Sequence, residues 1–360
     1  MPRLRKLLLN LHLCAGLIAG VFLILSGVTG SFMVFEDEID RALNPQMTWV
    51  TPGEKRLTLT EMKSGLEKKY PGRAVVAFLI SPRNDIAWEA GLQSKAPGAG
   101  APLNVAFNPF TGDVLGTGSD HNNFVGYVHS FHLRLMMGDA GSLLVSLAAV
   151  LLLVLSLSGV VLWWPRRLLT VNWRSQIKQL NFELHQTLGI YLSLFLMIFA
   201  ITALVIHWEN GATRLANRIT NSVDVPPFPR VQPWSANAVA LSPDRLLSIA
   251  ESAAPGAHAT WILLSANPVR IAMKYPEDRT PSGRTNLFID AYTGDIVFHL
   301  NSRSGPLGFR MVKLWNREIH TGDIGGLPTR ILACVTSLML PVMAVTGPLI
   351  WWNRRRQQVS

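Results

Sequence analysis

The sequence LHQTLGIYLSLFLMIFAITALVIHW, residues 184–208, contains no Asp, Glu, Lys or Arg. A helix needs about 20 mostly apolar residues to cross the hydrocarbon core of a bilayer. Three other stretches also lack these four residue types: residues 7–35, 140–165 and 331–353. The sequence therefore predicts an α-helical integral membrane protein with four transmembrane helices in a lipid bilayer. A composition of 49% hydrophobic and 16% charged residues also excludes a disordered, collagen-like or coiled-coil chain.

The net charge of +10 is concentrated in three short segments, residues 1–6, 165–178 and 353–360. These segments hold ten of the 33 basic residues and no acidic residue, so the rest of the chain carries 23 residues of each sign. Basic residues that flank apolar spans mark the cytoplasmic side of a membrane. A nucleic-acid-binding protein would instead carry a basic face on a domain. We therefore expect both termini in the cytoplasm and no nucleic-acid partner.

This topology divides the chain into cytoplasmic, membrane and external parts. The predicted parts are the N-terminus with the first span (1–35), the first outer domain with a His-bearing segment (36–139), the second span (140–165), a cytoplasmic loop (166–183), the third span (184–208), the second outer domain with a His-bearing segment (209–330), the fourth span (331–353) and a cytoplasmic tail (354–360). Each outer domain has the pattern of a small α+β unit: a helix, two strands and a hairpin. In the first domain we expect Thr60 to open the helix. We also expect residues 91–102 of the first domain and 221–237 of the second to be loops.

The two halves of the chain resemble each other in sequence. LHLCAGLIAGVF from Leu11 resembles LHQTLGIYLSLF from Leu184, and SGVVLWWPRR from Ser158 resembles TGPLIWWNRR from Thr346. The predicted fold is thus two tandem repeats of helix, outer domain and helix, related by an axis along the membrane normal. Every span also carries one pair of small residues, which we expect to serve helix packing: Thr29–Gly30, Ser158–Gly159, Thr202–Ala203 and Thr346–Gly347.

Six of the nine histidines lie near the ends of the predicted spans. They form an inner layer and an outer layer: His12 and His185 in the first, and His132, His320, His129 and His207 in the second. Ionisable groups at membrane depth are costly and usually functional. Two neutral imidazoles that face each other across a helix bundle are what bis-His haem ligation requires. Zinc is a weaker candidate because it prefers four ligands with help from thiolates or carboxylates.

Several alternatives remain open for these histidines. An interfacial histidine can cap a helix or hydrogen-bond a carbonyl without binding any metal. His132 and His320 could each pair with His207 or His129 instead of with each other. The last three histidines belong to the outer domains and have the pattern of surface or turn residues: His121, His258 and His299.

The order of these motifs resembles the PepSY-associated transmembrane-helix family over nearly the whole chain. The motifs include FHLRLMMGDAGSLLVSLAAV from Phe131, the hairpins FNPFTGDVLG and FIDAYTGDIVF, and IHTGDIGGLPTRILACVTSL from Ile319. The resemblance implies an iron-regulated bacterial inner-membrane protein with periplasmic PepSY-like domains. Its better understood members look like ferric-siderophore reductases that bind haem between four helices. The candidate axial ligands of two haem b groups are then His12, His185, His132 and His320.

On this resemblance, an inner haem would accept an electron from a cytoplasmic or quinol donor. An outer haem would pass it to a ferric siderophore docked between the outer domains, which releases Fe(II). The chain has no flavin or nicotinamide motif, so the reductant would be external. One alternative is a non-enzymatic membrane module whose PepSY-like domains bind or regulate a periplasmic partner such as a protease. Another is a permease, because Pro341 and Pro348 interrupt the fourth span, although membrane helices tolerate proline.

Overall fold

The computed structural model describes residues 2–96, 101–118, 123–230, 232 and 238–359. It consists of two compact units. The helical unit comprises Met1–Asp37, Asn123–Thr213 and Trp315–Ser360, and the sheet unit comprises Glu38–Asn122 and Arg214–Leu314. His121 and parts of the predicted loops 91–102 and 221–237 lie outside the described residues. Residues 91–94, predicted as loop, belong instead to a strand.

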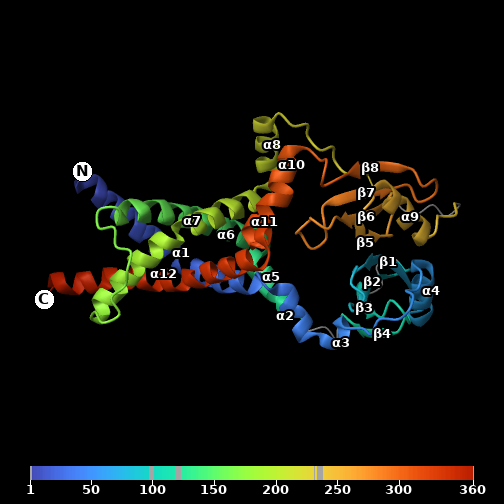
Figure 1. Ribbon diagram of the computed structural model, residues 1–360, viewed down its shortest axis with the longest axis horizontal. Helices are drawn as coiled ribbons and strands as arrows, with labels where there is room; N and C mark the ends of the chain where they lie inside the picture. Colours follow the sequence, from blue (N-terminus) through green and yellow to red (C-terminus); the bar gives the residue numbers. More distant parts are fainter. Residues whose placement is uncertain (1, 97–100, 119–122, 231, 233–237, 360) are drawn as a thin grey trace. The chain divides into compact units, whose positions relative to one another are not determined.

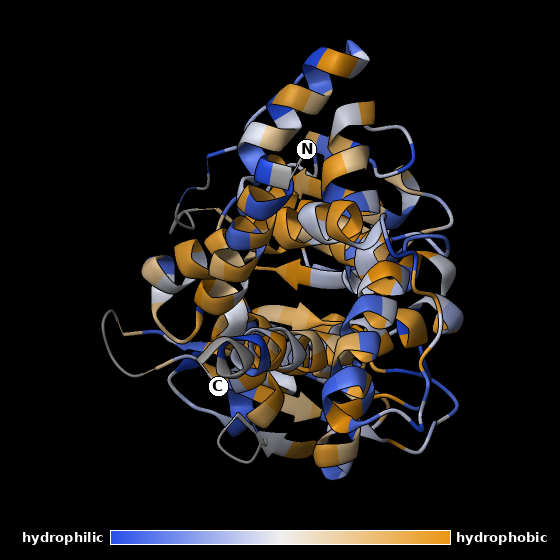
Figure 2. Cartoon of the chain, turned by 90° about the vertical axis from the view of Figure 1, so that its left-hand side faces the viewer, coloured by the Kyte–Doolittle hydropathy of each residue, from blue (hydrophilic) through white to orange (hydrophobic). Residues whose placement is uncertain are grey.

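Four long helices of the helical unit are apolar enough to span a membrane. They are α1 (Pro2–Met33), α6 (Gly138–Trp163), α7 (Ile177–His207) and α12 (Leu327–Val359). The prediction of a membrane protein with four apolar helices is confirmed, although α7 begins seven residues before the predicted span. α12 continues as one helix through Pro341 and Pro348. Figure 2 views these helices from the end where α1 begins and α12 ends, and apolar residues dominate them.

The four helices pack in a ring in which α1 contacts α6 and α12, and α7 contacts the same two helices. Leucines and alanines fill the centre, where Ala19 and Ala200 are almost completely buried. At Gly27, the backbone of α1 lies close against α12. A Cβ atom at this position would lie 2.6 Å from the Ser337 carbonyl oxygen. Small residues at such crossings let two backbones approach in lipid.

Two short helices attach to this ring and carry outer-layer histidines. α5 (Phe124–Arg134) packs against α1 and α6, and α11 (Asn316–Thr321) packs against α7 and α12. Residues 123–139, which contain the predicted His-bearing segment before the second span, belong to the helical unit. The remaining short helical elements are α2 (Glu36–Leu43), α3 (Pro45–Thr48), α8 (Glu209–Thr220), α10 (Leu307–Phe309), a π-helix (Arg310–Trp315) and a 3-10 helix (Asp323–Gly325).

The sheet unit contains one antiparallel sheet in the strand order β4-β3-β2-β1-β5-β6-β7-β8 (Figure 1). Its strands are β1 (Arg73–Leu79), β2 (Trp88–Ser94), β3 (Leu103–Phe107), β4 (Val114–Thr117), β5 (His258–Leu263), β6 (Val269–Lys274), β7 (Thr285–Ile289) and β8 (Ile296–Leu300). The expected hairpins are present as β3–β4 and β7–β8. The expectation of two separate α+β domains differs from this arrangement, because β1 pairs with β5 and joins the two predicted domains.

Two helices cover this sheet and share its core. α4 (Leu59–Lys69) packs against β1, α9 (Pro243–Ala253) packs against β5 and β7, and the two helices contact each other. Thr58, not the predicted Thr60, caps α4. The Thr58 hydroxyl accepts a hydrogen bond from the Glu61 backbone N–H, and the Glu61 carboxylate accepts one from the Thr58 backbone N–H. Thr60 has another partner, the carboxylate of Asp244 on α9.

Asp244 joins the N-termini of α4 and α9. Its carboxylate accepts the backbone N–H of Leu59 at 2.7 Å and that of Thr60 at 3.0 Å. A carboxylate beside helix N-termini is favoured both by these hydrogen bonds and by the helix dipoles. We expect Asp244→Ala to lower the free energy of unfolding of the sheet unit by about 1–2 kcal/mol. Thermal unfolding of the full chain, followed by circular dichroism, measures the loss. Glu251→Ala, which removes an exposed carboxylate of α9, is the control, and an equal effect of both changes would contradict this role.

Candidate functional site

His12 on α1 and His185 on α7 lie next to each other inside the bundle. Their ring centroids are 6.3 Å apart and their planes are nearly perpendicular, at 89°. Two metal–imidazole bonds of about 2.0 Å each, as in zinc sites, span about 4 Å. The rest of the 6.3 Å is the distance from each ring centroid to the ring nitrogen that would bind the metal. The pair is therefore spaced as two axial ligands of one metal atom would be.

Each of these two imidazoles is hydrogen-bonded through Nδ1 to a hydroxyl of a neighbouring helix. His12 Nδ1 lies 2.8 Å from Ser158 Oγ, and His185 Nδ1 lies 2.8 Å from Thr346 Oγ1. Both hydroxyls also contact the backbone carbonyl four residues earlier, at 2.6 Å for Ser158 and 2.7 Å for Thr346. A carbonyl can only accept, so each hydroxyl donates its single hydrogen there. Each hydroxyl oxygen then accepts the Nδ1–H of its histidine, which leaves the Nε2 lone pair available as a ligand.

The same arrangement recurs at two outer-layer histidines. His132 Nδ1 on α5 lies 2.9 Å from Thr29 Oγ1, and His320 Nδ1 on α11 lies 2.8 Å from Thr202 Oγ1. Both threonine hydroxyls donate to the carbonyl four residues earlier, each at 2.7 Å. Four imidazoles in the helical unit are therefore held in the tautomer that leaves Nε2 able to bind a metal ion.

The small-residue pairs of the four spans hold the histidines in place. This role is additional to helix packing, the role expected from the sequence. Each pair supplies the hydroxyl for one histidine, and in three pairs the next residue is a glycine against the ring. A Cβ at Gly30 would lie 3.1 Å from His132 Cε1, one at Gly347 would lie 3.3 Å from His185 Cε1, and one at Gly159 would lie 3.4 Å from His12 Cε1. The glycines therefore let the imidazoles lie close against the neighbouring helix.

Burial favours the neutral form of His132 on α5 and of His320 on α11. Burial lowers the pKa of His132 to about 4, with a smaller contribution from His129. Burial, followed by the neighbouring His132 and Arg317, also lowers the pKa of His320 to about 4. Desolvation disfavours the charged imidazolium, and a neutral imidazole is the form that binds metal.

The other predicted histidines have different partners. His129 Nδ1 lies 2.9 Å from a carboxylate oxygen of Glu36, and His207 Nδ1 lies 3.1 Å from Ser142 Oγ. Neither contacts a hydroxyl that also donates four residues back, so their tautomers are not fixed in the same way. His258 and His299 lie on β5 and β8 of the sheet unit. The ligand roles of His129 and His207 stay predictions.

A cavity of about 850 Å³ surrounds the inner pair. His12, His185, Gly159 and Gly347 line it, and its apolar walls come from all four long helices. Small-molecule and cofactor sites in proteins have volumes of about 300–1,000 Å³. Among the described residues no group of three or more His, Cys, Asp or Glu is placed to hold a metal ion. A haem iron needs only two protein ligands because the porphyrin supplies the others.

The profile of the PepSY-associated TM region matches residues 9–354 of the chain. The chain belongs to the PepSY-associated TM family. The matched residues include all four histidine–hydroxyl pairs of this PepSY-associated TM protein and its sheet unit. No curated protein matches the chain.

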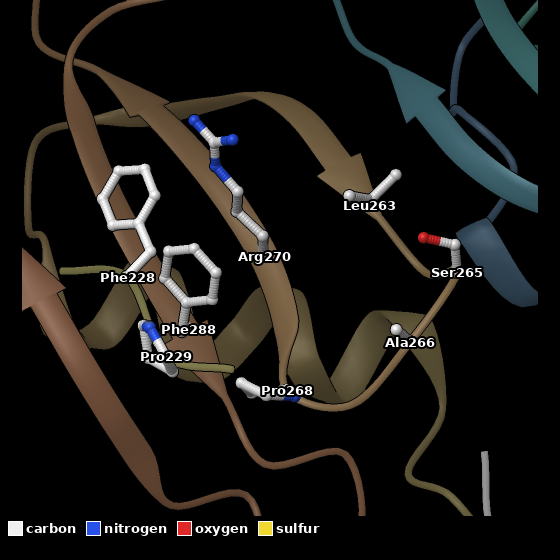
Figure 3. Close-up of a pocket in the computed structure, with 8 residues that line it drawn as sticks. All are labelled: Phe228, Pro229, Leu263, Ser265, Ala266, Pro268, Arg270 and Phe288. Atoms are coloured by element: carbon white, nitrogen blue, oxygen red, sulfur yellow. The ribbon is translucent and has the colours of Figure 1, made fainter. Parts of the chain in front are cut away.

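A second, smaller cavity of about 210 Å³ lies on the sheet unit of this PepSY-associated TM protein. Figure 3 shows the Arg270 side chain beside the rings of Phe228 and Phe288. The Arg270 guanidinium carbon lies 5.1 Å from the Phe228 ring centroid and 5.3 Å from that of Trp261. Its Nε donates to Asn286 Oδ1 at 3.0 Å. The rings and Asn286 thus explain where the Arg270 side chain lies. Together they form a structural cation–π cluster.

The hydroxyl partner of His185 provides a test of the inner pair. We expect Thr346→Val, which keeps the side-chain shape, to weaken metal or haem binding at the inner pair by about 10–100-fold, because such hydrogen bonds orient the ligand and fix its tautomer. Absorbance titration of the apoprotein measures the affinity. Thr213→Val is the matched control, since Thr213 also donates four residues back, to Glu209, and contacts no histidine. Equal affinities for Thr346→Val and the unchanged protein would contradict this role.

Proposed function

We propose that this PepSY-associated TM protein binds two haem b groups and carries electrons across a bacterial inner membrane to a ferric siderophore. The observation that carries the proposal is the state of four imidazoles, each with Nδ1 bonded to a hydroxyl and Nε2 left as a free lone pair. The resemblance drawn from the sequence motifs implies an iron-related role for such a site. Haem supplies a one-electron centre that alternates between Fe(III) and Fe(II).

The residues of the inner pair would hold this group in a fixed and dry position. His12 and His185 would bind the iron from α1 and α7, and Ser158 and Thr346 keep both rings oriented. The leucines around the cavity, Leu23, Leu152, Leu196 and Leu340, would exclude water from the porphyrin. Axial ligands, their hydrogen bonds and burial are the means by which a protein sets a haem potential.

His132 and His320 would bind the second group in the same manner. This assignment of the pairs is favoured by the matching hydroxyl partners and by the influence of His132 on the pKa of His320. The recurrence of these bonds and the mirrored strand order around β1 and β5 support two tandem repeats. The pair on the short helices would face the periplasm if the arginine-rich helix ends are cytoplasmic.

The substrate of this proposed reaction is a ferric siderophore in the periplasm. One electron, from a cytoplasmic or quinol donor, would convert its Fe(III) to Fe(II). Siderophores bind through hard oxygen donors, which hold Fe(II) more weakly, so the iron would leave. The chain would thus act as a reductase that requires an external donor.

A stopped-flow experiment without oxygen tests the reductase activity. The haem-loaded protein is reduced with dithionite, freed of excess reductant and mixed with a ferric hydroxamate siderophore in the presence of an Fe(II)-specific dye. We expect the reduced haem bands to decay as the Fe(II) dye complex forms, with one iron reduced per haem oxidised. Haem that stays reduced would contradict the reductase assignment. A colourless protein that captures a periplasmic protease would favour the non-enzymatic module.

A further inference from the structure

The mouth of the large cavity carries five basic side chains from three parts of the helical unit. We call them the basic rim: Arg5, Lys6, Arg166, Arg354 and Arg355. Among the described residues, no acidic side chain lines the cavity. The nearby carboxylate of Glu183 accepts hydrogen bonds from Asn172 and Gln179 instead. Within the part of the chain that the structure describes, no ion pair involves any member of the basic rim.

Two arginines of the basic rim, Arg5 and Arg354, lie in register with the inner histidine pair. Arg5 precedes His12 by seven residues on α1, and Arg354 follows Gly347, which contacts the His185 ring, by seven residues on α12. Seven residues are nearly two helical turns, or about 10.5 Å, and return to the same helix face. The cationic groups therefore lie on the faces that carry the histidine site, displaced toward one end.

Aromatic rings hold three guanidinium groups at this mouth. Phe182, one turn before His185 on α7, has the Arg166 guanidinium carbon at 4.9 Å and that of Arg354 at 5.9 Å from its ring centroid. Arg355 lies 4.8 Å from the Trp351 ring centroid. Stacking orders the guanidinium groups but does not neutralise them. Two guanidinium groups, one from the loop after α6 and one from α12, repel each other at one phenylalanine unless an anion lies between them.

The ligand that balances this charge must be apolar except along one acidic edge. The histidine end of the cavity is walled by leucines, and the opposite end is basic. Haem b has this distribution, because both of its propionate carboxylates lie on one edge of an apolar macrocycle. Carboxylates pair with arginine in bidentate, charge-assisted hydrogen bonds.

We propose that the basic rim binds the two propionates of the inner haem, so that the carboxylate edge of the porphyrin faces the end of the bundle where α1 begins and α12 ends. This inference rests on the proposed haem binding at His12 and His185. It goes further, because it names the residues that orient the ligand within the cavity. Arg166 and Arg354, which share Phe182, are the central pair of the site.

The test compares haem with haem dimethyl ester, in which both carboxylates are uncharged. Each ligand is titrated into detergent-solubilised apoprotein in a His132→Ala background, which leaves the inner pair as the haem site. We expect Arg166→Gln combined with Arg354→Gln to weaken haem binding by about tenfold or more, since hydrogen bonds between charged groups are lost. The ester should bind both forms equally. The matched control is Arg174→Gln. Arg174 is a basic residue of the loop that carries Arg166, but it does not line the cavity.

Each other outcome overturns part of this account. Equal weakening of haem and ester would mean that the two arginines support helix packing rather than propionate binding. Haem affinity that is unchanged in the double variant, with loss of binding to vesicles of anionic lipid, would assign the basic rim to the membrane surface. If neither ligand binds to protein with an intact basic rim, the proposed haem ligation itself is wrong.

Discussion

Replacement of His185 with alanine is expected to remove one of two haem groups and about half of the haem absorbance of the purified protein. The ring centroids of the inner pair lie 6.3 Å apart, a spacing that suits two imidazoles on one metal atom, and a haem with one remaining imidazole loses half of its axial bonds. His12→Ala should have the same effect. The double variant should lose no more than either single variant, because both residues serve one site.

The matched control for this prediction is His299→Ala in the sheet unit, which should keep the full haem content. The pyridine haemochrome assay, normalised to protein concentration, measures the number of haem groups per chain. Loss of both groups in His185→Ala, with an aggregated protein on gel filtration, would report unfolding rather than ligation. His185→Leu, which keeps side-chain bulk but offers no ligand atom, then separates the two. Full haem content in both single variants would contradict the inner site.

The second large effect is expected from Gly141→Ala, a change that adds one methyl group at the junction of α5 and α6. A Cβ atom at this position would lie 1.7 Å from the Arg134 carbonyl oxygen and 3.1 Å from Met137 Cβ. No side chain can relieve a collision with backbone, so α5 must move, and with it His132. We expect loss of the outer haem with retention of the inner one, and a cost of at least about 1–3 kcal/mol in stability.

Gly126→Ala is the matched control, because a Cβ at Gly126 on α5 meets no atom within 4 Å. This change should be neutral or slightly stabilising, since alanine favours helix over glycine. Redox titration distinguishes the two haem groups when their potentials differ, and the Gly141→Ala protein should show a single transition. Two unchanged transitions in Gly141→Ala would mean that the position of α5 does not determine the outer site.

The positions of the histidines relative to the spans could be predicted from sequence, because charge-free runs define the spans and a histidine is costly near them. The role of the small-residue pairs could not. Whether Ser158 contacts His12 depends on which helices are neighbours in the ring, and the sequence periodicity of one span says nothing about its neighbour. The recurrence of a hydroxyl residue before a small residue in all four spans was the available signal, and packing explained it equally well.

The single sheet was missed for a different reason. Strand patterns predict the elements and their hairpins, but the pairing of β1 with β5 joins segments that are far apart in the chain. The signal was the apolar character of residues 74–81 and 259–265, in which both faces are rich in apolar residues, as is usual in the centre of a sheet. The sequence favours Thr60 as the helix cap, because nothing in it indicates that the partner of Thr60 is a carboxylate from the other half, Asp244.

The haem content and ligation of the purified protein test the central claim most directly. Protein expressed with an adequate supply of haem should contain two haem b groups per chain. Its reduced spectrum should be that of a six-coordinate low-spin haem, and electron paramagnetic resonance of the oxidised form should show the signal of two near-perpendicular imidazoles at the inner site. A protein that is isolated without haem, and that binds none when haem is added to the folded apoprotein, would contradict the account.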